Sequence, residues 1–296
     1  MQSVMAFLLC ASSTRLGLSM QLSSRRMLLS RSFVGRLQSS STITNNEETL
    51  EIESSLRSVH TRIDAAVKSR PASISAAGVR LVAVSKTKPA SALVAAYSAG
   101  HRDFGENYVQ ELIEKSNHPD LAQLEGLNYH FIGKIQSNKA NMLIKKVPQL
   151  EIVETIDSLK LALKIDSAVK AAVDEGLRAP GALKVMIQVN SSGEPQKGGV
   201  ESNGEAVALA QEIFLNCPHL NLVGVMTIGN ADYTAGPSNF KFLDDCRKSV
   251  AEALSVEESS LELSMGMSGD FESAILHGST NVRVGSTIFG SRVYDK

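Results

Sequence analysis

The sequence predicts an α/β fold, a single (β/α)8 barrel of the TIM type with an extra N-terminal helix. Short β-branched runs alternate with helical stretches from Arg80 onward, and strict alternation implies parallel strands joined by right-handed crossovers. Eight such units suit a closed barrel, which uses roughly 250 residues. Neither a GxGxxG nor a GxxxxGK[ST] loop occurs, which weighs against a dinucleotide-binding or nucleoside-triphosphatase fold.

The extra helix is predicted between Asn46 and Arg70, where apolar residues recur at helical spacing until Pro71 stops the pattern. Eight predicted strands follow, and each but the last precedes a stretch that predicts a helix. In order, the strands are Leu81–Val84, Asp103–Gly105, His130–Ile132, Ile152–Thr155, Val185–Val189, Leu222–Met226, Leu261–Ser264 and Val282–Val284.

The composition is that of an ordinary globular protein, with 43% hydrophobic and 21% charged residues among 296. A net charge of -1 gives no support to a nucleic-acid or anionic-membrane surface. Cys10, Cys217 and Cys246 are widely separated and have no CxxC or CxxH neighbours. We therefore expect neither a metal site nor a disulfide framework. A reducing compartment is expected for the same reason.

Residues 1–45 differ in composition from the rest, because they hold five arginines and no acidic residue. This is the composition of an organellar transit peptide, and the arginine bias favours the mitochondrion over the plastid. The alternative is an untargeted tail on a cytoplasmic protein. The expected organisation is thus a tail over 1–45 and one barrel domain over 46–296.

Lys86 is the leading candidate for covalent chemistry. It follows the first strand, and side-chain alternation places it on the same face as Val82 and Val84. If these valines fill the barrel, Lys86 lies at its mouth, where chemistry in such barrels is located. A partly desolvated lysine offers a neutral amine that can attack an aldehyde and form a Schiff base. Lys88 is a competitor that spacing alone does not exclude.

Polar or polarisable residues also stand in or just after other strands. Asn107 follows the second strand, His130 begins the third, and Met226 ends the sixth. Taken singly, each is better explained as a loop, capping or core residue.

The last two units carry a more specific signal. Ser268 follows the seventh strand, and Gly285 and Ser286 follow the eighth, at the starts of two short predicted helices. Barrels often bind phosphate after these two strands, where backbone N–H groups and helix dipoles converge. Arg283 lies inside the otherwise apolar eighth strand, so it needs a partner in the protein or in a ligand.

Taken together, these stretches resemble the pyridoxal phosphate homeostasis protein family over residues 50–294. An N-x-x-x-E-x-x-K-x-G pattern runs from Asn190 to Gly199, with an additional glycine at Gly198. The other matching stretches are AVSKTKP (83–89), FGENYVQE (104–111), HFIGKIQSNK (130–139), SMGMSGDFESAI (264–275) and GSTNVRVGSTIFGSR (278–292).

The resemblance implies a fold-type III barrel, similar to the N-terminal domain of alanine racemase, that holds pyridoxal 5′-phosphate. Lys86 would form the Schiff base, and Arg283 would face the pyridine nitrogen. Ser268, Gly285 and Ser286 would bind the phosphate. Asn107, His130 and Met226 would line the ring.

The resemblance further implies a cofactor carrier in vitamin B6 homeostasis that delivers pyridoxal phosphate to apoenzymes and has no catalytic residue. Because the sequence shows no second, β-rich domain of the alanine racemase type, we expect an open site and a monomer. Two alternatives remain open from the residues alone. One is an amino-acid racemase that uses the same cofactor, and the other is a lysine-dependent barrel aldolase acting on a phosphosugar.

Overall fold

The computed structural model describes residues 38–74, 78–194, 196–229 and 236–291, with side chains from residue 47 onward. The predicted tail over 1–45 therefore falls almost wholly outside the described residues. Among those described, no helix combines the length and apolar character needed to cross a membrane.

Eight parallel strands close into a barrel in sequence order, which confirms the predicted fold class. Closure is made by β1, which pairs with β2 on one side and with β8 on the other. The strands are β1 (Arg80–Val84), β2 (Asp103–Glu106), β3 (Asn128–Phe131), β4 (Leu150–Ile156), β5 (Leu183–Gln188), β6 (Leu220–Met226), β7 (Glu262–Ser264) and β8 (Asn281–Val284).

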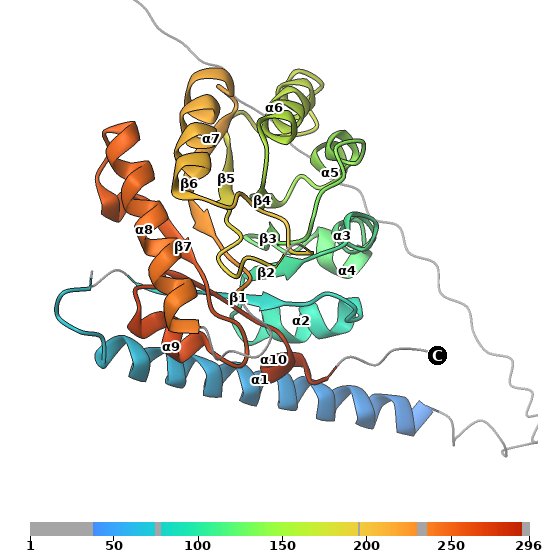
Figure 1. The fold of residues 1–296 in the computed structure, drawn as a ribbon. Coiled ribbons are helices and arrows are strands. Elements are labelled where there is room, and N and C mark those ends of the chain that lie inside the picture. The colour runs from blue at the N-terminus through green and yellow to red at the C-terminus, as the bar shows by residue number, and fades with distance from the viewer. Residues whose placement is uncertain (1–37, 75–77, 195, 230–235, 292–296) are drawn as a thin grey trace, which may run out of the picture. The chain divides into compact units, whose positions relative to one another are not determined.

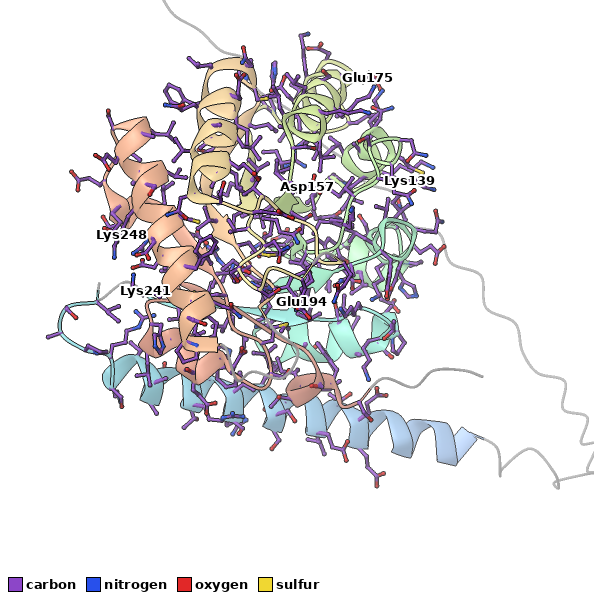
Figure 2. All side chains as sticks on the ribbon, viewed as in Figure 1. Lys139, Asp157, Glu175, Glu194, Lys241 and Lys248 are labelled. Carbon is purple, nitrogen blue, oxygen red and sulfur yellow. The ribbon has the colours of Figure 1, made fainter. Side chains whose placement is uncertain are left out.

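Helices follow the strands and cover the outside of the barrel, as Figure 1 shows. They are α2 (Ala90–Ser98), α3 (Val109–Ser116), α4 (Pro119–Ala122), α5 (Ala140–Lys146), α6 (Leu159–Asp174), α7 (Asn203–Asn216), α8 (Gly236–Leu254), α9 (Phe271–Leu276) and α10 (Ser286–Phe289), with a short 3-10 helix at Glu258–Ser260. The labelled charged residues Lys139, Glu175, Lys241 and Lys248 lie exposed on this outer layer (Figure 2).

The extra helix, α1 (Gln38–Lys68), begins earlier than the predicted Asn46. The prediction relied on an apolar stripe, and a helix once nucleated can extend beyond the stripe. Most of the stripe is buried in the main core, with Ile52, Val59 and Ile63 at most 4% exposed, whereas Leu50 is 64% exposed.

Two cores of different character result. The main core lies between strands and helices and is mainly apolar, although a few charged groups, among them Glu106 and Lys115, are buried there too. Inside the barrel, a small apolar cluster of Ile152, Met186 and Met226 shares the space with buried polar residues, among them Glu154 and Arg283. The barrel interior therefore does not resemble the layers of branched aliphatic side chains usual in such barrels.

Candidate functional site

A cavity of about 220 Å³ opens among the carboxyl ends of the strands. Parallel strands all end on this face, so the loops after β1, β2, β3, β6, β7 and β8 contribute side chains to one place. It is lined by seven of the eight residues predicted from the sequence, namely Lys86, Asn107, Met226, Ser268, Arg283, Gly285 and Ser286.

His130 is the exception, and the structure does not bring it to this cavity. It lies on β3 two residues before Ile132, which does line the cavity. Because alternate residues of a strand face the same side, His130 points into the barrel one layer deeper than Ile132. It lines a different cavity near the amino ends of the strands, together with Arg80 and Asp103.

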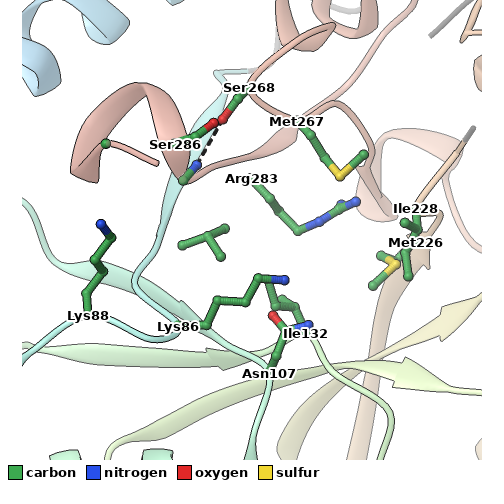
Figure 3. A pocket seen from close by; sticks show the side chains of 13 residues that line it. Lys86, Lys88, Asn107, Ile132, Met226, Ile228, Met267, Ser268, Arg283 and Ser286 are labelled. Carbon is green, nitrogen blue, oxygen red and sulfur yellow. Dashed lines mark hydrogen bonds between the residues drawn. The ribbon is translucent and has the colours of Figure 1, made fainter. Parts of the chain in front are cut away.

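Lys86 reaches into the cavity from the loop after β1. Its side chain extends beside Asn107 and beneath Arg283 (Figure 3). Lys88 also borders the cavity, but its ammonium donates a hydrogen bond to the carbonyl of Ser291, 3.1 Å away at the rim. Both lysines therefore line the cavity, and Lys88 is bonded at its rim.

Asn107 presents an unsatisfied acceptor. Its Oδ1 atom is buried and has no hydrogen-bond partner among the described residues. The backbone at this position is fixed because Gly133 packs against it so closely that a Cβ atom on Gly133 would lie 2.0 Å from the Asn107 carbonyl oxygen. A buried polar atom without a partner is costly, so this amide fits a ligand that brings a hydrogen-bond donor.

The loops after β7 and β8 form the opposite wall. The Gly285 N–H donates to Ser268 Oγ at 3.2 Å, which ties the two loops together (Figure 3). A Cβ atom on Gly285 would lie 3.2 Å from the Val84 carbonyl oxygen, so the absence of a side chain keeps this corner open. The small hydroxyl residues Ser268 and Ser286 line this wall and suit an anionic group.

Arg283 is buried, with 4% of its surface exposed. Its guanidinium donates to Ser264 Oγ at 2.5 Å and to the Thr227 carbonyl at 2.6 Å. Burial lowers the pKa of Arg283, and the charges of Glu154 and Asp270 oppose that effect. Guanidinium stays protonated in proteins, so this group is a fixed cation and a donor only.

A hydrogen-bonded chain continues from Arg283 into the barrel. Ser264 donates to Glu154 Oε2 at 2.5 Å, and Glu154 Oε1 lies 2.8 Å from His130 Nδ1. His130 Nε2 in turn lies 3.4 Å from Asp103 Oδ1. His130 is therefore linked to Arg283 through Glu154 and Ser264. The sequence analysis did not predict either of these two residues. A glutamate inside the apolar β4 was the available signal.

A model of the alanine racemase N-terminal domain family matches residues 63–293. The human protein named pyridoxal phosphate homeostasis protein is 45% identical over 251 residues, which cover 83% of this chain and 89% of that protein. Its namesake from Vibrio cholerae is 41% identical over 225 residues, covering 74% and 87% of the two chains.

Solved structures of similar proteins point to the same family and fold. PipY of Synechococcus elongatus, solved with pyridoxal phosphate bound, is 31% identical with a TM-score of 0.62, and the match covers 81% of this chain and all of that one. Alanine racemase from Corynebacterium glutamicum, at 14% identity and a TM-score of 0.58 over 82% of this chain and 62% of its own, shares the fold. The chain thus belongs to the pyridoxal phosphate homeostasis protein family, with the barrel of the alanine racemase N-terminal domain.

Proposed function

We propose that this protein binds pyridoxal 5′-phosphate in the cavity formed by Lys86, Asn107 and Arg283, and acts as a carrier of the cofactor without being an enzyme. One observation carries the proposal. A lysine amine, a fixed arginine cation, an unsatisfied amide oxygen and a hydroxyl-rich loop pair converge on a single cavity. These groups match an aldehyde, an aromatic nitrogen, a ring hydroxyl and a phosphate.

Each residue has a separate task in this arrangement. The neutral Lys86 amine would attack the aldehyde carbon and hold it covalently, and the aldehyde oxygen would leave as water. Ser268, Gly285 and Ser286 bind the phosphate through hydroxyl and backbone N–H donors. Asn107 accepts the hydrogen bond that its buried Oδ1 atom lacks.

Pyridoxal phosphate, when bound to an enzyme, supplies an electron sink for carbanions. Arg283 discourages that use. As a permanent donor already bonded to Ser264 and Thr227, it keeps its protons and does not transfer one to a ring nitrogen. The cofactor would therefore be held in a form that is poor at stabilising negative charge.

The cavity also offers few acid–base groups. Its described lining contains no carboxylate, histidine, tyrosine or cysteine, and its charged members are Lys86, Lys88 and Arg283. Racemisation needs a proton acceptor and a proton donor on opposite faces of the substrate carbon. This lining supports a carrier over a racemase.

The first test is the absorption spectrum of the purified protein before and after addition of pyridoxal phosphate. We expect a visible band of covalently held cofactor, lost in Lys86→Ala and retained in the matched variant Lys88→Ala. A wild-type protein that stays colourless after the addition would overturn the cofactor assignment. It would favour the alternative hypothesis of a lysine-dependent aldolase. If the band were lost in Lys88→Ala instead, Lys88 rather than Lys86 would be the lysine that holds the cofactor.

The second test separates a carrier from an enzyme. The loaded protein is mixed with an apoenzyme that requires pyridoxal phosphate, and reactivation is compared with that by free cofactor. Exchange of amino-acid α-protons for deuterium is followed in parallel. Transfer without exchange supports the carrier. Exchange that depends on Lys86 would make the protein a racemase-type enzyme.

We propose that the protein is located in the mitochondrion and is a monomer. The arginine-rich, acid-free composition of residues 1–45 supports the mitochondrial location. A fluorescent protein fused behind residues 1–45 is expected to enter mitochondria, and plastid or cytoplasmic fluorescence would contradict this. Light scattering of the purified protein tests the monomer.

A further inference from the structure

A charged cluster lies behind Lys86, outside the cavity. It consists of Glu106 at the end of β2 and of Glu111 and Lys115 on α3. None of the three lines the cavity. Their side chains are 0%, 23% and 7% exposed, respectively. Charges so well buried interact strongly and are fixed in place by their partners.

Lys115 is the centre of this cluster. Its ammonium donates to Glu106 Oε1 at 2.6 Å, to Glu111 Oε1 at 2.7 Å and to the Ser85 carbonyl at 2.7 Å. An ammonium has three protons, and all three are used here. Ser85 is held a second time, because its hydroxyl donates to Glu106 Oε1 at 2.7 Å. The residue immediately before Lys86 is thus fixed through its carbonyl and its hydroxyl, and its N–H donates to the Gly105 carbonyl at 3.0 Å.

The residue after Lys86 is fixed by the same cluster. Thr87 has a φ of 62°, a left-handed conformation that is unfavourable for a β-branched residue. Its N–H donates to Glu111 Oε1 at 2.6 Å. The same carboxylate oxygen therefore accepts from Lys115 and from the strained backbone, and this contact compensates for the strain.

We propose that Glu106, Glu111 and Lys115 are positioning residues that clamp Ser85 and Thr87 and so aim Lys86 into the cavity. This inference rests on the proposed function, in which Lys86 captures pyridoxal phosphate. The flexible stem of a lysine gains little direction from its own bonds. A backbone fixed on both sides restricts where the amine can reach, and the rate of a bimolecular attack depends steeply on such placement.

Glu111 is the best residue to change, because it is the most exposed of the three and its removal leaves no buried hole. We compare Glu111→Ala with Glu111→Gln, whose amide oxygen can still accept the Thr87 N–H. The control is Glu114→Ala, which removes an exposed carboxylate of the same helix that bonds Gln110. Each variant is also made in a Lys86→Ala background.

The main measurement is the rate of covalent capture of pyridoxal phosphate, followed by borohydride trapping and mass spectrometry. We expect Glu111→Ala to slow capture about tenfold, Glu111→Gln to restore most of the rate, and Glu114→Ala to leave it unchanged. In the Lys86→Ala background, equilibrium dialysis should show equal non-covalent binding with and without Glu111→Ala.

A second measurement does not need the cofactor. Amide hydrogen exchange at Thr87 and Lys88 in the cofactor-free protein should be faster in Glu111→Ala than in wild type or Glu114→Ala. Unchanged capture and unchanged exchange in Glu111→Ala would overturn the positioning role, as would weaker non-covalent binding in the Lys86→Ala background. If wild type captured no cofactor, the proposed function would fail, while faster exchange in Glu111→Ala would still establish the clamp itself.

Discussion

The inside of the barrel and the layer between its strands and helices each bury a histidine, and the two behave oppositely. His130 lies inside, 1% exposed, between Glu154 and Asp103. His101 lies in the outer layer, 7% exposed, with its ring 5.2 Å from that of Phe104. Similar burial therefore occurs in very different electrostatic surroundings.

The pKa values follow from these surroundings. Burial lowers the pKa of His101 to about 4, and it outweighs the opposing effects of the hydrogen bond to the Asp103 carbonyl and of the Asp103 charge. Burial also disfavours a charged His130, but the hydrogen bonds that its ring donates to the carboxylates of Asp103 and Glu154 outweigh it and raise the pKa of His130. The apolar layer keeps its histidine neutral, whereas the barrel interior favours the charged form.

The comparison teaches that the interior is a connected charge network and the outer layer mainly a packed core. Arg283 faces the cofactor cavity at one end of the network, and Asp103 faces the other end of the barrel. Changes inside should therefore spread to several partners, while changes in the outer layer should stay local.

The largest effect is expected from Glu154→Leu. This change removes the acceptor of Ser264 and Asn281 and the partner of His130. Because buried groups lose their partners, the free energy of unfolding should fall by about 3–5 kcal/mol. Denaturant unfolding of the cofactor-free protein measures it.

The matched control for that change is Glu151→Leu on the same strand. Glu151 pairs with Lys184, and both side chains are more than 40% exposed, so its loss should cost less than about 1 kcal/mol. Equal effects of Glu151→Leu and Glu154→Leu would contradict the idea that the interior network is special.

Next in size is the pH dependence of stability. A histidine whose folded pKa is lowered, as in His101, loses stabilisation as pH falls below its ordinary value of 6.5. One whose folded pKa is raised, as in His130, loses it as pH rises above 6.5 toward the folded value. Each arm has a slope of at most about 1.4 kcal/mol per pH unit. Unfolding measured across this range should show a maximum near the ordinary pKa.

Two substitutions separate the arms. His101→Gln should flatten the acidic arm alone, and His130→Gln should flatten the alkaline arm at a lower overall stability. A profile in which His130→Gln leaves the alkaline arm intact would show that His130 is neutral in the folded protein.

The smallest effect is expected from Tyr129→Phe in the outer layer. The Tyr129 hydroxyl is fully buried and has no partner among the described residues. Burial raises the pKa of this phenol, so it stays neutral. Removing an unsatisfied polar group should change the free energy of unfolding by less than about 1 kcal/mol, or stabilise the protein. A loss above about 2 kcal/mol in thermal or denaturant unfolding would indicate that a water bridges the Tyr129 hydroxyl to another buried group. Glu106 Oε2 is the candidate, because it also has no hydrogen-bond partner among the described residues.

Much of the site was predictable because barrel chemistry follows strand order. Lys86, Ser268, Arg283 and Ser286 each follow or end a strand, and closure brings those ends together. The depth of a side chain was less predictable. His130 on β3 and Ile132 just after it are two residues apart on the same face, and only the register of the closed barrel decides that Ile132 reaches the cavity.

The sequence by itself determined the alternation of strands and helices, the closed barrel and the face that carries Lys86. These follow from hydrophobic periodicity and chain connectivity, which are local properties. Only the tertiary structure decided the clamp of Glu111 and Lys115 on Ser85 and Thr87, and the chain from Arg283 through Ser264 to Glu154 and His130. Those contacts join residues from 19 to 110 positions apart, and no local pattern encodes which buried charges meet after the barrel closes.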